Sequence, residues 1–298
     1  MSQVSLAQVR ATYKRRDAWW TVLLVDPLAG RLVRIAAGAG WVTPTRLTVT
    51  AFLLGLGAAG AFLAGTPGWL FAGALLYHLG FVIDCMDGKL ARLRGTDSIL
   101  GSWLDFVLDR VRVVLCLGAL FGGQFQQTGE PLFLLFAIGA VFFALFGYLN
   151  GAETDKALAR MAKLVAADRP ARAAAGSDGH PATGAGPAPA PPAGLDRVRA
   201  ALHRHRIRVN LVSGVEFEMF LLVVAPLAAA LWRPEGLLWV AAAATLLLVG
   251  FELALMARFW ITARSFDRRR GADRTPVPVP AQRSGESAPA GQRARYPA

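Results

Sequence analysis

The amino-acid sequence predicts an all-α, polytopic membrane protein, with six transmembrane helices preceded by an interfacial amphipathic helix. Of its 298 residues 54% are hydrophobic, and the mean hydropathy is +0.42. The apolar residues form blocks close to 20 residues long, which is the length of a helix that crosses a bilayer. Basic residues gather next to alternate blocks, as the flanking loops of a multi-span protein require.

The first element is expected within residues 1–42. Trp19, Trp20 and neighbouring leucines alternate with charged residues such as Arg31 and Arg34. These stretches are too short or too charged to span a bilayer, so they predict one or two helices that lie along the cytoplasmic surface.

Six apolar blocks follow and divide the rest of the chain. They lie at 47–65, 69–90, 100–122, 131–150, 210–232 and 235–258. We therefore expect a surface segment at 1–42, helices one to four at 43–151, a partly disordered cytoplasmic insertion at 152–209, helices five and six at 210–260, and a disordered basic tail at 261–298. Within the insertion, two charged stretches at 153–170 and 195–208 are expected to form short surface helices beside a linker rich in Ala, Gly and Pro.

Basic residues predict the orientation. The amino-terminal segment, the link between blocks two and three and the carboxyl-terminal tail are all rich in arginine, whereas the opposite links together hold a single basic residue. Both termini should therefore face the cytoplasm from the cell membrane. The net charge of +12 fits this topology and anionic membrane lipids, so no nucleic-acid partner is expected.

The best functional candidates are Asp84, Asp87, Asp105 and Asp109, which lie beside or within apolar stretches. Residues three or four apart on a helix share a face, so each pair of aspartates points one way from its own helix. A short turn at 93–98 makes the two helices antiparallel, and both pairs can then meet near the cytoplasmic end. Carboxylate oxygens suit Mg²⁺ or Mn²⁺, and this number is enough for two ions.

The segment around these aspartates resembles the signature of the CDP-alcohol phosphatidyltransferase family. The pattern D-x2-D-G-x2-A-R-x8-G-x3-D-x3-D is matched by Asp84, Asp87, Gly88, Ala91, Arg92, Gly101, Asp105 and Asp109. The resemblance implies an integral membrane enzyme of phospholipid biosynthesis, active as a homodimer. Such an enzyme transfers a substituted phosphate from a CDP-linked donor, here expected to be CDP-diacylglycerol, to the hydroxyl of a polar alcohol and releases CMP.

The resemblance also assigns roles to residues. All four aspartates would hold metal, and Asp109 would in addition act as general base on the acceptor hydroxyl. The residues expected to bind the CDP donor are Gly88, Ala91, Arg92, Gly101 and Thr48. The small ones let a ligand approach the helix, and Arg92 offers a charged fork to phosphate. Thr48 matches the threonine of the family's Pro-Asn-x-x-Thr segment, although Thr45 replaces the asparagine.

The acceptor alcohol is expected to be phosphorylated. Arg110 and Arg112 adjoin the last aspartate and would favour inositol phosphate or glycerol phosphate. The segments 14–20 and 27–31 are similar to the lead-in of the inositol-phosphate-transferring branch of the family, which makes an inositol-like acceptor the first expectation.

Two glutamates near the start of the fifth block are left with two interpretations. Glu216 and Glu218 could bind neutral hydroxyl groups of the acceptor, or they could pair with Arg206 or Arg208. Charge is expensive at such a position, so a partner is expected in either case.

Two other functions are weighed against this one. A membrane prenyltransferase also holds a diphosphate through paired aspartates, but it places its acidic motifs in well-separated loops. A cation transporter could use the aspartates for coupling, but it should have further polar residues deep in the other helices, and blocks one, four and six have very few.

Overall fold

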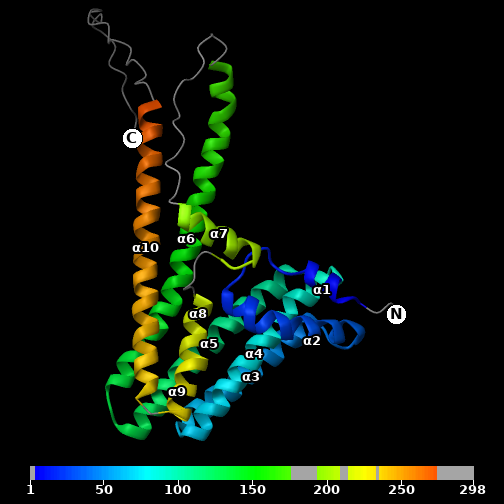
Figure 1. Cartoon of the computed structure of the whole chain (residues 1–298), viewed down its shortest axis with the longest axis vertical. Coiled ribbons are helices and arrows are strands. Elements are labelled where there is room, and N and C mark those ends of the chain that lie inside the picture. The colour runs from blue at the N-terminus through cyan, green and yellow to red at the C-terminus, as the bar shows by residue number, and fades with distance from the viewer. Residues whose placement is uncertain (1–3, 176–192, 209–213, 233–234, 274–298) are drawn as a thin grey trace, which may run out of the picture. The chain divides into compact units, whose positions relative to one another are not determined.

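The structure, a computed structural model, describes residues 4–175, 193–208, 214–232 and 235–273, and the elements of this part are all helices (Figure 1). Each apolar block forms a helix or a continuous helical run. These are α3 (Pro44–Ala64), α4 (Pro67–Arg94), α5 (Ile99–Thr128), α6 (Leu132–Ala175), the run of α8 (Gly214–Met219), the π-helical turn η2 (Phe220–Val224) and α9 (Ala225–Leu231), and finally α10 (Gly236–Asp273). The prediction of a helical polytopic protein is confirmed.

Five helices in the described residues are long and apolar enough to cross a membrane. They are α3, α4, the part of α6 to Ala167, the run Gly214–Leu231 and the part of α10 to Arg270. The remaining predicted span, the third block at 100–122, corresponds to α5, which is 30 residues long but includes two aspartates, two arginines and a glutamine-rich end. A sixth span therefore stays a prediction.

The amino-terminal segment forms α1 (Leu6–Ala11), the π-helical turn η1 (Thr21–Val25) and α2 (Asp26–Gly38). Helix α2 buries Ala29 and Val33, whereas Ile35 is 72% exposed. An exposed apolar side chain on a helix beside the bundle suits a membrane surface. The amphipathic helix exists, and its place at the interface remains a prediction.

The ends of α4 and α5 place the aspartate motif. Helix α4 stops at Gly95, whose φ of 62° is a left-handed conformation that glycine adopts easily. Helix α5 then begins behind Ser98, whose hydroxyl accepts a hydrogen bond from the Gly101 amide at 3.0 Å. The turn between the two helices is thus fixed by local sequence, and it makes them antiparallel as predicted.

Small residues let α3 lie close to α4 and α5. A Cβ added to Gly80 of α4 would lie 3.2 Å from the carbonyl oxygen of Ala51. One added to Gly55 of α3 would overlap the aliphatic part of Arg112 on α5. Close approach through small residues is typical of helices that pack in a membrane.

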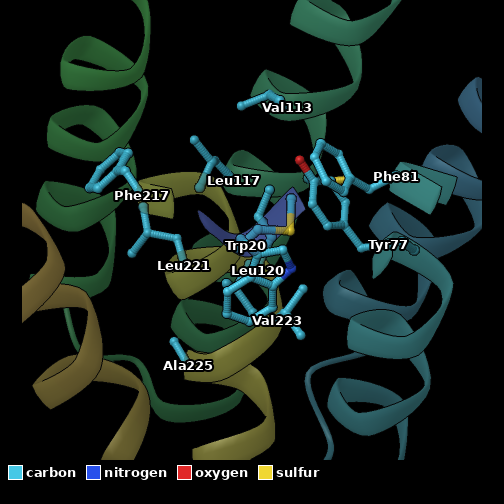
Figure 2. Close-up of a cluster of buried hydrophobic side chains, with 14 of the residues drawn as sticks. Trp20, Tyr77, Phe81, Val113, Leu117, Leu120, Phe217, Leu221, Val223 and Ala225 are labelled. Carbon is cyan, nitrogen blue, oxygen red and sulfur yellow. The ribbon is translucent and has the colours of Figure 1, made fainter. Parts of the chain in front are cut away.

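A cluster of buried apolar side chains holds the second half of the bundle to the first (Figure 2). Tyr77 and Phe81 of α4 meet Leu117 of α5 and Phe217 of α8 in this cluster. Trp20, from the amino-terminal segment, enters it with only 8% of its surface exposed. The core therefore joins segments that are far apart in the chain and packs against both motif helices.

Two predictions about the insertion and the tail were wrong. The stretch 153–170, expected as a separate helix, continues α6 without a break, and the tail is helical to Asp273 rather than disordered from 261. Both stretches are rich in Ala and Arg, which propagate a helix. Helix α7 (Ala193–Arg204) agrees with the expected second surface helix, whereas 176–192 and 274–298 lie outside the described residues. The chain divides into units 1–256 and 257–298, and the aspartate motif lies in the first.

Candidate active site

Three of the four predicted aspartates come together. Asp84 and Asp87 of α4 and Asp105 of α5 each offer a carboxylate oxygen, and these oxygens lie within 4.8 Å of one another. Asp87 is only 6% exposed, and the Thr48 hydroxyl donates a hydrogen bond to its Oδ2 at 2.5 Å. Such a group of hard oxygen ligands can hold a divalent cation.

Asp109 lies beside this group but is not part of it. Its carboxylate accepts hydrogen bonds from both Arg110 and Arg112. Arg112 is 1% exposed, and its Nη1 lies 3.5 Å from Oδ1 of Asp84. A buried guanidinium therefore bridges the metal-ligand group and Asp109.

Arg110 is held from its other side by the fifth predicted span. Its Nη1 lies 2.8 Å from Oε1 of Glu218, its guanidinium carbon is 3.6 Å from the centre of the Tyr148 ring, and the Tyr148 hydroxyl donates to Glu218 at 3.2 Å. Glu216 instead accepts a hydrogen bond from the backbone amide of Trp19 at 3.2 Å. The predicted partners of both glutamates, Arg206 and Arg208, were therefore wrong, because those arginines pair with aspartates of the amino-terminal segment.

A cavity of about 390 Å³ opens between the ends of α3, α4 and α5. Its wall contains every residue predicted to bind the CDP donor, namely Thr48, Gly88, Ala91, Arg92 and Gly101. It also contains polar residues that the sequence analysis did not select, namely Thr43, Thr45, Thr96, Asp97, Ser98 and Ser102. Short hydroxyl side chains near helix ends resemble ordinary caps in a sequence, so they gave no separate signal.

Gly88 and Arg92 act together in this wall. A Cβ added to Gly88 would lie 3.2 Å from Nη1 of Arg92, so the absence of a side chain makes room for the guanidinium. Nε of Arg92 donates to the carbonyl oxygen of Thr12 at 2.8 Å. The remaining nitrogens of this exposed side chain can therefore face a ligand in the cavity.

A second cavity, of about 260 Å³, adjoins the first at the aspartates. All four motif aspartates line it, and it shares Asp87, Gly88, Arg92 and Asp105 with the first cavity. Its other charged residues are Lys14, Asp17, Asp26, Lys89 and Arg208. Arg110 and Arg112, predicted to bind the acceptor, line neither cavity.

Asp26 and Lys89 are the most informative residues that the sequence analysis missed. Nζ of Lys89 lies 3.0 Å from Oδ1 of Asp26, and both side chains are about 5% exposed. The Tyr13 hydroxyl donates to the carbonyl oxygen of Asp26 at 3.1 Å, and burial followed by the charge of Asp26 raises the pKa of Tyr13. An acidic residue amid apolar neighbours, the criterion that selected the motif, would also have selected Asp26.

Comparison with known proteins agrees with the motif. Residues 41–167 match the family model described as CDP-alcohol phosphatidyltransferase. The matched segment covers α3, α4, α5 and most of α6, and so contains the whole motif and all the residues that line the first cavity.

Three curated proteins illustrate the relatives. The bifunctional IPC transferase and DIPP synthase of Thermococcus kodakarensis is 44% identical over 100 residues, which are 34% of this chain and 22% of that protein. The phosphatidylinositol phosphate synthase of Mycobacterium tuberculosis is 30% identical over 129 residues, 43% of this chain and 56% of that one. The archaetidylinositol phosphate synthase of Methanothermobacter thermautotrophicus is 33% identical over 100 residues, 33% of this chain and 46% of that one. The chain thus spans about half or less of the length of these relatives.

Among solved structures, the crystal structure of the Mycobacterium tuberculosis phosphatidylinositol phosphate synthase with CDP-DAG bound superposes with a TM-score of 0.48 and 17% sequence identity. The superposition covers 80% of this chain and 94% of that one.

Proposed function

We propose that the chain, which carries a CDP-alcohol phosphatidyltransferase domain at residues 41–167, transfers a substituted phosphate from a CDP-linked lipid to the hydroxyl of a polar alcohol. One observation supports this most strongly. Two cavities share Asp87 and Asp105, so a donor in one and an acceptor in the other can reach the same atoms. The name of the phosphatidylinositol phosphate synthase favours CDP-diacylglycerol as donor, and the names of both synthases favour an inositol-type acceptor.

Asp84, Asp87 and Asp105 would hold the metal, as Mg²⁺ or Mn²⁺. Their carboxylate oxygens lie close enough to share an ion, and no ion pair within the described residues reaches Asp87 or Asp105. When bound, the cation would neutralise charge on the donor diphosphate and help CMP to leave. We propose two ions, with Asp109 at the edge of the site.

The first cavity would bind the donor. Gly88, Ala91 and Gly101 leave space for its diphosphate next to the helices, and Thr48 orients Asp87. Arg92 belongs to both cavities and is the cation best placed to contact the phosphate that is transferred.

The second cavity would bind the acceptor, with Asp109 as general base. Arg110 and Arg112 hold the Asp109 carboxylate in place, which is the role we now give them instead of binding the acceptor. The acceptor O–H would give its proton to Asp109 while its oxygen forms a bond to phosphorus, and the bond from that phosphorus to the CMP oxygen would break.

The charges of the second cavity support a phosphorylated acceptor, such as inositol phosphate or glycerol phosphate. Lys14, Lys89, Arg92 and Arg208 all line it. Once metal offsets the motif aspartates, these basic side chains would favour an anion there.

The setting we propose is a six-span homodimer in the cell membrane, with both termini and the aspartates facing the cytoplasm. The arginine distribution supports this orientation. CMP would then be released into the cytoplasm.

Release of CMP by the purified full chain in detergent tests the proposal. CDP-diacylglycerol and Mg²⁺ or Mn²⁺ are supplied with inositol phosphate, glycerol phosphate, inositol or serine, and Asp109→Asn serves as the inactive control. Release that requires one acceptor, the metal and Asp109 is the expected result. Folded, metal-binding protein that releases no CMP with any acceptor would refute it, and a prenyl diphosphate donor and ion flux would then be the alternatives to test.

A further inference from the structure

Helix α7 ends with an unusual residue. The Arg206 amide donates to the carbonyl of His203 at 3.2 Å, and the Ile207 amide donates to that of Leu202 at 2.9 Å. This bond pair forms the Schellman motif, in which glycine is the usual residue at the left-handed position. Here that position is Arg206, with φ of 62°, the one non-glycine residue with positive φ in the described part of the chain. A non-glycine residue in this conformation costs free energy, so contacts of its side chain should offset that cost.

The Arg206 side chain does have such contacts, and all are with the amino-terminal segment. Its Nη2 and Nε donate to the carbonyl oxygen of Lys14 at 2.8 and 3.1 Å, and its Nη1 lies 3.1 Å from Oδ2 of Asp26. Its guanidinium carbon lies 4.8 Å from the centre of the Tyr13 ring. One guanidinium therefore contacts several residues of the amino-terminal segment, which lie 180 residues or more from it in the sequence.

The backbone on both sides of Arg206 is attached to the same segment. The Asp17 amide donates to the Arg206 carbonyl, and the Arg208 amide donates to the Asp17 carbonyl, both at 2.9 Å. This is an isolated parallel bridge between Asp17 and Ile207. We call residues 13–17 together with 206–208 the clasp.

The clasp reaches the motif helix through Asp26. The carboxylate of Asp26 is shared between Arg206 and Lys89, and Nζ of Lys89 also donates to the carbonyl oxygen of Cys85 at 2.9 Å. Cys85 is the neighbour of Asp84 on α4. A buried charge pair of this kind is held firmly, because loss of one partner leaves the others unpaired.

The clasp is also a wall of the second cavity. Lys14, Asp17 and Asp26 each contact Arg206, and each lines that cavity, as does Arg208 from the clasp itself. None of these residues lies within the segment 41–167 that matches the family model. Arg206 does not itself line the cavity.

We propose that Arg206 is a positioning residue for the acceptor alcohol: through the clasp it fixes the shape and charge of the second cavity. This rests on the proposed function, because it takes that cavity as the acceptor site. Without the Arg206 side chain, the Lys14 carbonyl and Asp26 each lose a partner, and only the backbone bonds and the Arg208–Asp17 ion pair still hold the clasp, while the first cavity and the CDP donor site keep their walls.

The test compares Arg206→Gly, Arg206→Ala and Arg206→Lys in the full chain with inositol phosphate or glycerol phosphate, whichever the unmodified protein uses. The Gly variant removes the side chain but suits the left-handed backbone, so the helix end stays intact. The Ala variant removes the side chain and keeps the backbone strain. Arg204→Ala, an exposed arginine at the end of α7, is the matched control.

We expect the Gly and Ala variants to raise the KM for the acceptor by about 10-fold or more, because the groups that move are those that would contact the acceptor. The KM for CDP-diacylglycerol should stay within about twofold, since the donor cavity is not altered. The acceptor KM of the Lys variant should lie between theirs and that of the unmodified chain, since lysine keeps the positive charge but lacks the several planar donors of a guanidinium. Thermal unfolding should show the Gly variant folded and more stable than the Ala variant, whose backbone is strained at this position.

Three results would overturn the proposal. They are an unchanged acceptor KM in the Gly and Ala variants, equal rises in the KM of donor and acceptor, and recovery of full activity in the Gly variant, which would make Arg206 only a helix cap. In each of these results the unmodified chain is active, so the proposed function stands. An inactive unmodified chain with every acceptor would overturn both.

Discussion

Gly55→Ala is the most stringent test of how the site is supported, because it adds one methyl group far from any substrate. The new Cβ would overlap the Cγ and Cδ of Arg112, whose side chain is 1% exposed and has no free space to move into. Arg112 holds both Asp84 and Asp109. Gly55→Ala should therefore displace a guanidinium that positions two aspartates of the site.

The magnitude follows from two opposing effects. Replacing Gly by Ala within a helix stabilises it by roughly 0.5–1 kcal/mol. Overpacking a buried site costs about 1–3 kcal/mol, so the variant should be less stable by up to roughly 2 kcal/mol. A shift of Arg112 by about an ångström should also lower kcat by about 10- to 100-fold, because it moves Asp109 relative to the acceptor hydroxyl.

The same substitution elsewhere on α3 is the control. A Cβ at Gly60 would meet nothing within 4 Å, and one at Gly57 would lie 3.7 Å from a leucine methyl group, an ordinary contact. CMP release and the thermal unfolding midpoint are measured for all three variants. Gly57→Ala and Gly60→Ala should retain activity and stability. If Gly55→Ala behaves like them in both assays, the argument that Gly55 seats Arg112 is wrong.

Three further predictions concern the metal, the donor and the buried ion pair. Thr48→Val should weaken Mn²⁺ binding or CMP release by about 10- to 100-fold, because it removes the hydroxyl that orients Asp87. Thr48→Ser keeps a hydroxyl and should retain both properties. Equal loss in the two variants would contradict this role for Thr48. Arg92→Ala should raise the KM for CDP-diacylglycerol by roughly 10-fold or more, since a hydrogen bond to a charged group contributes about 1.5–3 kcal/mol, and an unchanged KM in steady-state kinetics would place the diphosphate elsewhere. Glu218→Ala should destabilise the protein by about 3–5 kcal/mol, because it leaves Arg110 buried with only Asp109 as a charge partner. The double variant Arg110→Ala, Glu218→Ala should lose less free energy of unfolding than the two single variants together. Additive losses in unfolding experiments would mean that the pair is not coupled.

Local sequence signals predicted the parts of the fold that local sequence determines. The turn between α4 and α5 depends on Gly95 and Ser98, and both signals lie within a few residues of the structure they produce. The meeting of Asp84 and Asp87 with Asp105 followed from helical spacing and that turn. The first cavity followed for the same reason, since its walls are the adjoining ends of consecutive helices.

The second cavity could not be predicted in this way, because its walls come from segments that are distant in the chain. Asp26, in its wall, lies 180 residues from its partner Arg206, and the Arg110–Glu218 pair beside Asp109 spans 108 residues. Charge alone allowed several pairings for these residues. The arginine–glutamate pairings expected for the start of α8 were physically reasonable, but the bundle brings Glu218 to α5 and turns residues 206–208 toward the amino-terminal segment.

The distribution of positive charge separates roles that spacing alone could not. Asp109 is compensated within the chain by Arg110 and Arg112. Among the described residues, Asp84 forms an ion pair with Arg112 at 3.5 Å, and Asp87 and Asp105 form none. Three carboxylates so close together with one ion pair among them repel one another, and a divalent cation relieves that repulsion. Asp109 does not depend on a metal in this way, and it also faces the second cavity. The same charge balance therefore supports metal binding by the first three aspartates and proton transfer by the fourth.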